Sequence, residues 1–239
     1  MAPAFKSRTA CGAGIEMSVI PLAKRPVTVP LPELKEEATV NNTYQPVYIE
    51  SGTYIVRSLR TTDASEELLS WLNRADMLRG LNLKKIDFDL PQLRNFIASF
   101  DNYHHYILGI FDCPDNRLVG FYTIDVNRTH KTGSLTTGIG DTSERGRRTL
   151  WATIDAILDH FYAQRDIEKF TARILARNYA MLFNFKNNTR FTLEAHLKRE
   201  CLAPDGKRVD LLVFASFKDT PPQTISRHAL HHQERQSDD

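Results

Sequence analysis

The chain has few cysteines for its 239 residues. Cys11, Cys113 and Cys201 are odd in number, lie far apart and lack the paired spacing of a zinc site. A framework of disulfides is therefore not expected, and a reducing compartment is the simple inference. None of the three has an evident catalytic neighbour in the sequence, which argues against a cysteine nucleophile.

Long apolar runs are also missing. No stretch approaches the length of a membrane-spanning helix, and the N-terminus lacks the compact hydrophobic segment of a signal peptide. These absences predict a cytoplasmic protein that does not act in a membrane. The net charge is only +2, from 31 basic and 29 acidic residues, so the composition does not require a nucleic-acid partner.

The two ends of the chain show little periodicity. Six prolines interrupt residues 1–46, which are predicted to be a flexible leader, and residues 219–239 are predicted to be a disordered polar tail. His228, His231 and His232 in that tail lack acidic or cysteine partners, so no metal site is expected. The hydrophobic content of 41% is enough for one good core, and residues 47–218 are predicted to form one folded domain.

Hydrophobic periodicity and turn residues predict the order of elements in this domain. Helices are expected over 63–74, with Asp63 as the N-cap, and over 90–100, 149–164 and 179–187. Strands are expected over 54–60, 106–111, 118–126, 133–140, 169–176, 192–200 and 209–217. The segment 204–206, Pro-Asp-Gly, joins the last two strands and is a strong hairpin signal.

The stretch from Gly133 to Tyr162 leads from a strand through a basic loop into an amphipathic helix. The first turn of a helix has free main-chain N–H groups at the positive end of the helix dipole, where an anion is stabilised. The loop adds three arginines, and Gly146 permits close approach by a ligand. A diphosphate fits this pattern, but a solvated basic turn or a nucleic-acid contact would use the same residues. A Gly-Lys-Ser/Thr phosphate loop and a complete dinucleotide-binding fingerprint are both absent.

This element order, with the basic loop after the fourth expected strand, resembles the GCN5-related N-acetyltransferase (GNAT) family, and most closely its ribosomal-protein and diamine branch. In that branch the loop is similar to Arg-Gly-Lys-Gly-Tyr-Gly, and the same positions here, 145–150, hold Arg-Gly-Arg-Arg-Thr-Leu. Asn178 matches the asparagine of an Asn-x-x-Ser segment, with Met181 in place of the serine. Residues 194–199 and 210–214 look like the last two strands of the branch.

The resemblance covers about residues 54–217 and implies an α/β (α+β) fold. The expected architecture is a mixed, mainly antiparallel twisted sheet of about seven strands with helices on both faces. It also implies acetyl-CoA (coenzyme A) as co-substrate, without a metal.

Particular positions acquire roles from the resemblance. The pantetheine arm would be bound, and the thioester carbonyl polarised, by the main chain at the splayed end of the fourth strand: Thr137, Gly138, Ile139 and Gly140. The pyrophosphate of coenzyme A would be held by the loop and the start of the helix: Arg145, Gly146, Arg147, Arg148 and Thr149. Asn178 would bind the pantetheine or an ordered water beside it.

Acyl transfer to an amine needs an acid, or a positive field, for the leaving thiolate. The two usual donors are replaced here, the serine by Met181 and a tyrosine by Phe185. Tyr179, Tyr122 or a water remain open as the acid, and thiolate is stable enough to leave without one.

The amine must also lose a proton to a base or to a chain of waters. The candidates for the base are His104, His105, Asp125 and Glu194, and the sequence does not rank them.

The expected activity is therefore transfer of an acetyl or other short acyl group from coenzyme A to a primary amine of a protein or small molecule, by direct attack in a ternary complex. Residues 77–101 and the final hairpin would select the acceptor.

Two alternatives stay open: a catalytically silent acyl-CoA-binding protein with a regulatory or interaction role, and an RNA contact through the arginines. The RNA contact ranks last, because aromatic residues for base stacking are not interleaved with the arginines. Relatives occur as monomers and as homodimers, and the sequence does not decide between them.

Overall fold

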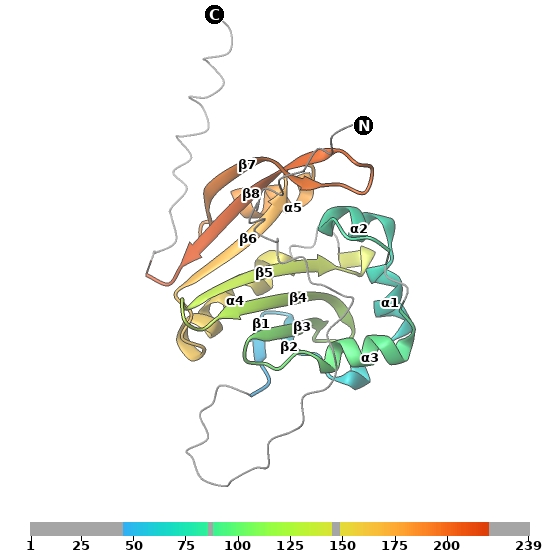
Figure 1. Cartoon of the computed structure of the whole chain (residues 1–239). Helices are drawn as coiled ribbons and strands as arrows, with labels where there is room; N and C mark the ends of the chain where they lie inside the picture. The colour runs from blue at the N-terminus through green and yellow to red at the C-terminus, as the bar shows by residue number, and fades with distance from the viewer. Residues whose placement is uncertain (1–44, 86–87, 145–148, 220–239) are drawn as a thin grey trace, which may run out of the picture. The chain divides into compact units, whose positions relative to one another are not determined.

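The computed structural model describes residues 45–85, 88–144 and 149–219. The predicted leader up to residue 44, the tail from 220 and loop residues 145–148 lie outside the described residues. The described residues form one sheet of eight strands in the order β1-β2-β3-β4-β5-β6-β8-β7 (Figure 1). Its strands are β1 (Tyr48–Ser51), β2 (Tyr54–Ser58), β3 (His105–Asp112), β4 (Leu118–Asn127), β5 (Thr132–Ile139), β6 (Lys169–Leu175), β7 (Thr192–Leu202) and β8 (Arg208–Phe217).

The sheet confirms the expected fold class. Every neighbouring pair of strands is antiparallel except β5 and β6, which run parallel. The strand that the sequence did not reveal is β1, which has four residues and pairs with β2 at one edge. The helices are α1 (Glu66–Leu72), α2 (Ala75–Leu81), α3 (Leu90–Ala98), α4 (Thr149–Gln164) and α5 (Tyr179–Lys186), with 3-10 turns η2 (Thr61–Asp63) and η3 (Thr142–Glu144).

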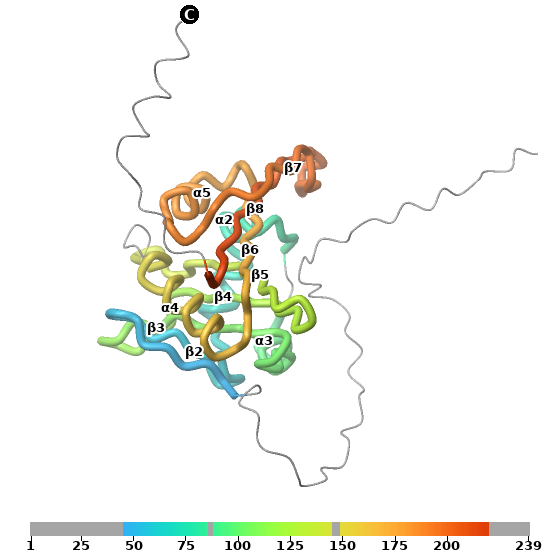
Figure 2. The backbone as a smooth tube through the Cα atoms, turned by 90° about the vertical axis from the view of Figure 1, so that its left-hand side faces the viewer, coloured from blue at the N-terminus to red at the C-terminus, as the bar shows by residue number. Residues whose placement is uncertain are grey.

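The helices cover both faces of the sheet, as Figures 1 and 2 show. On one face α4 and α5 pack against the strands, and α4 buries residues three and four apart, as predicted for 149–164: Leu150, Ile154, Ile157, Leu158 and Phe161. On the other face α1, α2 and α3 form a second cluster with the strands, which includes Trp71, Met77, Leu93 and Phe121. The two clusters place a hydrophobic core on each side of the sheet.

The first helix begins later than the sequence suggested. Ser65, not Asp63, is its N-cap, and the Ser65 hydroxyl accepts a hydrogen bond from the Leu68 N–H at 3.2 Å. The Asp63 carboxylate instead pairs with Arg57, at 2.8 Å. The expected helix over 63–74 is therefore replaced by the turn η2 and the shorter α1, followed by α2, which the sequence analysis missed.

The pairing of β5 with β6 is short, and this positions the site. The two strands are in register only from Thr132–Leu135 against Lys169–Ala172. Beyond that point β5 remains paired with β4 as far as Ile139, while β6 follows β8 as far as Leu175. The strands therefore diverge at this end of the sheet, as Figure 1 shows, and we call it the open end.

Candidate functional site

Main-chain groups of β5 face the gap left by β6 at the open end. The Gly140 N–H donates to the Val119 carbonyl of β4 at 3.0 Å. Because these groups alternate along an antiparallel ladder, Gly138 also faces β4, whereas Thr137 and Ile139 direct their N–H and C=O groups toward the side that β6 has left. Of the four positions predicted to bind a ligand through the main chain, the geometry thus favours Thr137 and Ile139.

The glycines that follow these two residues, Gly138 and Gly140, have a packing role. A Cβ on Gly138 would lie 2.8 Å from the Met77 sulfur, and a Cβ on Gly140 would overlap the Trp71 indole. Any side chain here would push α1 and α2 away from the strand, since cores have no room for added atoms. Gly138 and Gly140 therefore let these helices pack directly on the main chain of the candidate site.

An arginine that the sequence analysis did not single out fixes the end of β5. Arg74, the N-cap residue of α2, donates from Nη1 to the Gly140 carbonyl at 2.6 Å, and its Nη2 lies 3.5 Å from the Ile139 carbonyl oxygen. Its Nε donates to Asp76 at 2.7 Å. The carboxylate and the strand end together hold the guanidinium beside the open end. The spacing of Arg74 and Asp76 in the sequence could have indicated an ion pair. Because α2 was not predicted, the sequence did not show that this pair lies at the start of a helix.

The ends of the basic loop are held together by a buried carboxylate. Glu144, in η3, accepts hydrogen bonds from the Tyr54 hydroxyl at 2.7 Å and from the Thr149 hydroxyl at 3.2 Å. Thr149 is the first residue of α4 and is buried. Since Glu144 precedes and Thr149 follows Arg145–Arg148, these bonds fix where the loop leaves β5 and where α4 begins. The structures of the four loop residues themselves lie outside the described part of the chain.

Asn178 connects two helices at the open end. It is the N-cap of α5, and its side-chain oxygen accepts from the Met181 N–H at 3.3 Å. Its Nδ2 donates to the Gly80 carbonyl of α2 at 3.4 Å. The neighbouring Tyr179 is 79% exposed. The structure thus brings Asn178 and Tyr179 to the same end of the sheet as Thr137 and Ile139, because β6 ends there and α5 follows it.

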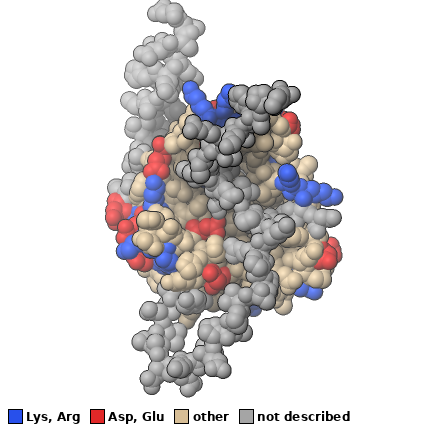
Figure 3. Space-filling view, viewed as in Figure 1, with Lys and Arg blue, Asp and Glu red and all other residues tan. Residues whose placement is uncertain are grey.

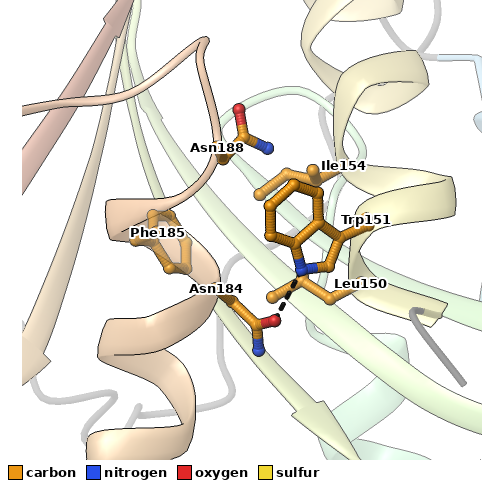
Figure 4. A pocket seen from close by; sticks show the side chains of 6 residues that line it. All are labelled: Leu150, Trp151, Ile154, Asn184, Phe185 and Asn188. Atoms are coloured by element: carbon orange, nitrogen blue, oxygen red, sulfur yellow. Dashed lines mark hydrogen bonds between the residues drawn. The ribbon is translucent and has the colours of Figure 1, made fainter. Parts of the chain in front are cut away.

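A row of polar contacts joins α4 to α5 and to the segment that follows α5. The Trp151 indole N–H donates to the Asn184 side-chain oxygen at 2.7 Å, and a small hollow lies around this contact (Figure 4). Further along, Asn188 contacts Asp155 at 3.4 Å and Arg190 pairs with Asp159 at 2.8 Å. The α4 members of these contacts, Trp151, Asp155 and Asp159, are four residues apart and therefore share one face of the helix. The row fixes the spacing of two helices whose N-termini both lie at the open end.

The structure does not bring the predicted bases to the open end. His104 precedes β3 at the opposite end, where its side chain lies 3.6 Å from Asp101. His105 and Asp125 pair at 2.6 Å, and Asp125 is in register with Ser134, four residues or about 13 Å from Gly138. Glu194 lies on β7, three strands from β5, and pairs with Lys169 at 2.5 Å.

Two aromatic residues near the site are core residues. Phe185, at the position of the family's usual tyrosine, is buried with Phe191 and Phe214. Tyr122 on β4 is fully buried, and its hydroxyl lies 2.7 Å from the Thr153 hydroxyl. Burial raises the pKa of Tyr122 strongly. Tyr122 is therefore a poor proton donor, which leaves Tyr179 or water from the predicted acids.

Charge on the face with α1–α3 is mixed rather than of one sign. Figure 3 shows basic and acidic side chains at both its left-hand and right-hand edges, with basic ones at the top and acidic ones near the centre. Within residues 45–85, 88–144 and 149–219, no group of three or more His, Cys, Asp or Glu side chains is arranged to hold a metal ion. Nor does this part of the chain contain a helix both long and apolar enough to cross a membrane.

Comparison with known proteins places this geometry in a recognised fold. No protein-family model and no curated protein matches the chain. Solved structures do match: a ribosomal L7/L12 alpha-N-protein acetyltransferase, RimL, has a TM-score of 0.63 at 17% identity over 75% of this chain and 98% of its own. The ribosomal-protein-S5-alanine acetyltransferase of Vibrio fischeri has a TM-score of 0.64 at 15% identity over 73% and 100%.

A third similar structure is the spermidine N-acetyltransferase of Vibrio cholerae in complex with CoA and spermine, with a TM-score of 0.62 at 14% identity over 70% of this chain and 96% of its own. Another, from Bacillus anthracis, is described as a GNAT-family acetyltransferase. The chain therefore has the fold of the GNAT acetyltransferases, and the similarity extends over nearly the whole length of those proteins. The predicted resemblance to the ribosomal-protein and diamine branch is confirmed at the level of fold.

Proposed function

We propose that the protein is an acetyl-CoA-dependent N-acetyltransferase that acts on a primary amine. The observation that carries the proposal is the divergence of β5 from β6, which directs the main-chain groups of Thr137 and Ile139 into the gap at the open end. The fold supports it, since similar structures include acetyltransferases with CoA bound.

The described residues suit a thioester of coenzyme A. A pantetheine arm carries amide groups, which pair with main-chain donors and acceptors such as those of Thr137 and Ile139. Thr149 starts a helix of 16 residues, whose N-terminus favours a phosphate group. From the sequence, Arg145, Gly146, Arg147 and Arg148 complete the pyrophosphate site. Asn178, which bonds to Gly80 of α2 and to Met181 of α5, would fix these two helices beside the gap.

The reaction would be direct transfer in a ternary complex. The nitrogen of the neutral acceptor amine forms a bond to the thioester carbonyl carbon, and the carbon–sulfur bond breaks, which releases the coenzyme A thiolate. Main-chain N–H groups of the β5 end stabilise the negative charge that develops on the carbonyl oxygen. The chain's own contribution is mainly binding, orientation and this preorganised field.

Proton movements are assigned by position. Because His104 and Glu194 lie away from the open end, the amine proton passes to water rather than directly to either side chain. Tyr179, exposed beside Asn178, is the described hydroxyl best placed to protonate the thiolate. The positive ends of the α4 and α5 dipoles favour the thiolate as well.

A second function competes with this one: a catalytically silent protein that binds acyl-CoA for regulation or interaction. The observation in its favour is that Phe185 and Met181 occupy the positions of the usual proton donors. Binding of coenzyme A is common to both functions, whereas thiol release in the presence of an amine is expected only of the enzyme.

The test begins with calorimetric titration of the full chain with coenzyme A and with acetyl-CoA. Micromolar binding is expected, and the doubly substituted Arg145→Ala, Arg147→Ala protein should bind more weakly, by a few kcal/mol at most, through loss of charge-assisted contacts to phosphate. Absence of binding would overturn the proposal. Binding without thiol release across a panel of peptide, polyamine and amino-sugar acceptors would favour the silent binder.

A further inference from the structure

Basic side chains gather around one side of the open end. They come from α2, the segment after it, and the β7–β8 hairpin, and all are exposed. We define this cationic rim by six residues: Arg79, Lys84, Lys85, Lys198, Lys207 and Arg208. The parts of the chain that contribute them are more than 100 residues apart in sequence, so only the fold assembles them.

Direct contacts join the two halves of the rim. The Asn82 side chain, at the C-terminus of α2, donates to the Leu202 carbonyl of β7 at 3.1 Å. Arg177 donates to the Asn82 side-chain oxygen at 3.1 Å and lies 3.4 Å from the Arg79 carbonyl oxygen. Since Arg177 also follows β6 and precedes Asn178, the rim adjoins the gap between β5 and β6.

Among the described residues of α2 and the β7–β8 hairpin, the carboxylates next to the rim are each engaged in another contact. Asp76 is bound to Arg74 at 2.7 Å, and Glu200 pairs with Arg173 at 3.2 Å. Asp210 lies 2.8 Å from His196 and also accepts from the Arg199 N–H. Asp205, in the turn of the hairpin, accepts from the N–H of Lys207. Asp76 and Glu200 are therefore paired with arginines outside the rim, and the rim keeps a positive excess.

Such a rim selects among amine acceptors by charge. A polyamine carries several ammonium groups and would be repelled, whereas a polypeptide with carboxylates would be attracted and oriented. Positive charge near the acceptor also disfavours the protonated form of its amine, which increases the fraction of the neutral nucleophile. Both effects act in the same direction at the open end.

We propose that the acceptor amine belongs to an acidic polypeptide segment, which the cationic rim binds while the amine enters the open end. The proposal rests on the proposed acetyltransferase function and specifies its substrate class. It predicts that an acidic peptide is preferred over spermidine as an acceptor.

The first test compares initial rates of coenzyme A release with three acceptors: a peptide with several Asp and Glu residues after its free N-terminus, the same peptide with Lys in their place, and spermidine. The acidic peptide should have the highest kcat/KM, and its advantage should fall as ionic strength rises from about 50 to 300 mM. A higher kcat/KM for spermidine or for the basic peptide would overturn the inference. Absence of transfer to any amine, despite coenzyme A binding, would instead count against the acetyltransferase itself.

The second test reverses charge within and outside the rim. The Arg79→Glu, Lys207→Glu double variant should lose about tenfold in kcat/KM for the acidic peptide, mostly through KM. The matched control is Arg94→Glu, Lys218→Glu, which makes the same charge change at exposed positions of α3 and after β8. Its kcat/KM should stay within about twofold of the parent value. Equal losses in both proteins would overturn the inference.

Two further outcomes separate the rim from other ligands. Affinity for coenzyme A should be unchanged in the rim variant, and a parallel loss of that affinity would show that the rim binds the cofactor instead. An unstructured RNA should inhibit acetyl transfer to the acidic peptide no more strongly than a second acidic peptide does. Tight RNA binding that blocks the acidic peptide and is lost in the rim variant would assign the surface to nucleic acid.

Discussion

The side chain of Asn178 donates to the main-chain carbonyl of Gly80 at 3.4 Å, and so connects the start of α5 to the last turn of α2. The two helices lie on opposite faces of the sheet. One residue thus connects the layer proposed to hold the cofactor with the layer proposed to admit the acceptor, at the point where β6 ends.

Substitutions of Asn178 separate its two contacts. Asn178→Ala removes the helix cap and should lower the free energy of unfolding by about 1 kcal/mol. Asn178→Asp keeps an acceptor for the Met181 N–H but removes the donor to Gly80, so its stability should be closer to that of the parent protein. If the connection between the helices matters for activity, kcat/KM should fall in both. Full activity of Asn178→Asp would make the residue a helix cap only. Urea unfolding and steady-state kinetics provide the two measurements.

Arg74 is expected to position the end of β5. Arg74→Ala removes the bond to the Gly140 carbonyl, so the main chain of Ile139 becomes less well fixed. We expect kcat/KM to fall roughly tenfold or more, and coenzyme A affinity to fall as well, because Ile139 is one of the two positions proposed to bind the pantetheine arm. Arg74→Lys keeps the charge and should recover part of the loss. Asp76→Asn is the control for the ion pair alone, and an effect as large as that of Arg74→Ala would show that the pair, rather than the strand contact, is responsible.

Gly140 should not tolerate a side chain while Trp71 is present. Gly140→Ala places a methyl group against the indole, and overpacking of this kind costs about 1–3 kcal/mol. Trp71→Leu removes much of the ring, so the double variant should be less unstable than the sum of the single variants. Ser134→Ala, elsewhere on β5, is the control. Strict additivity in thermal unfolding would show that the two residues do not compete for the same space.

His160 should make stability depend on pH. Burial and then the nearby charge of Arg165 lower its pKa below the ordinary value of 6.5. The unfolded chain consequently binds more protons than the folded one below about pH 6.5, and folding free energy is lost as pH falls through this range. His160→Gln should flatten the profile between about pH 7.5 and 5. An unchanged slope in His160→Gln would contradict the assignment.

Much of the fold could be predicted from local pattern, and α4 shows why. Its apolar residues recur at three and four positions over 16 residues, and both of its ends match the prediction. The splayed end of β5 was placed by family resemblance, because no local pattern reports where a neighbouring strand departs. Periodicity also failed for β1 and α2, which are short.

The missed parts of the site have the same physical origin. Arg74 contacts Gly140 across 66 residues, and Asn178 contacts Gly80 across 98, so their partners are set by the fold and not by spacing. Glu144 and Thr149 are only five residues apart, yet the buried Tyr54 that joins them comes from β2. The predicted bases were chosen by residue type alone, which carries no information about the end of the sheet at which a side chain lies.

The edge of the sheet formed by β7 also has a consequence for association. At this edge β7 shifts register between Leu193 and Ala195 and again between Leu197 and Cys201, and Arg199 adopts a φ of 54°. Such irregular main chain cannot align a continuous row of hydrogen bonds with a further strand. The sheet therefore resists the addition of a further strand along β7.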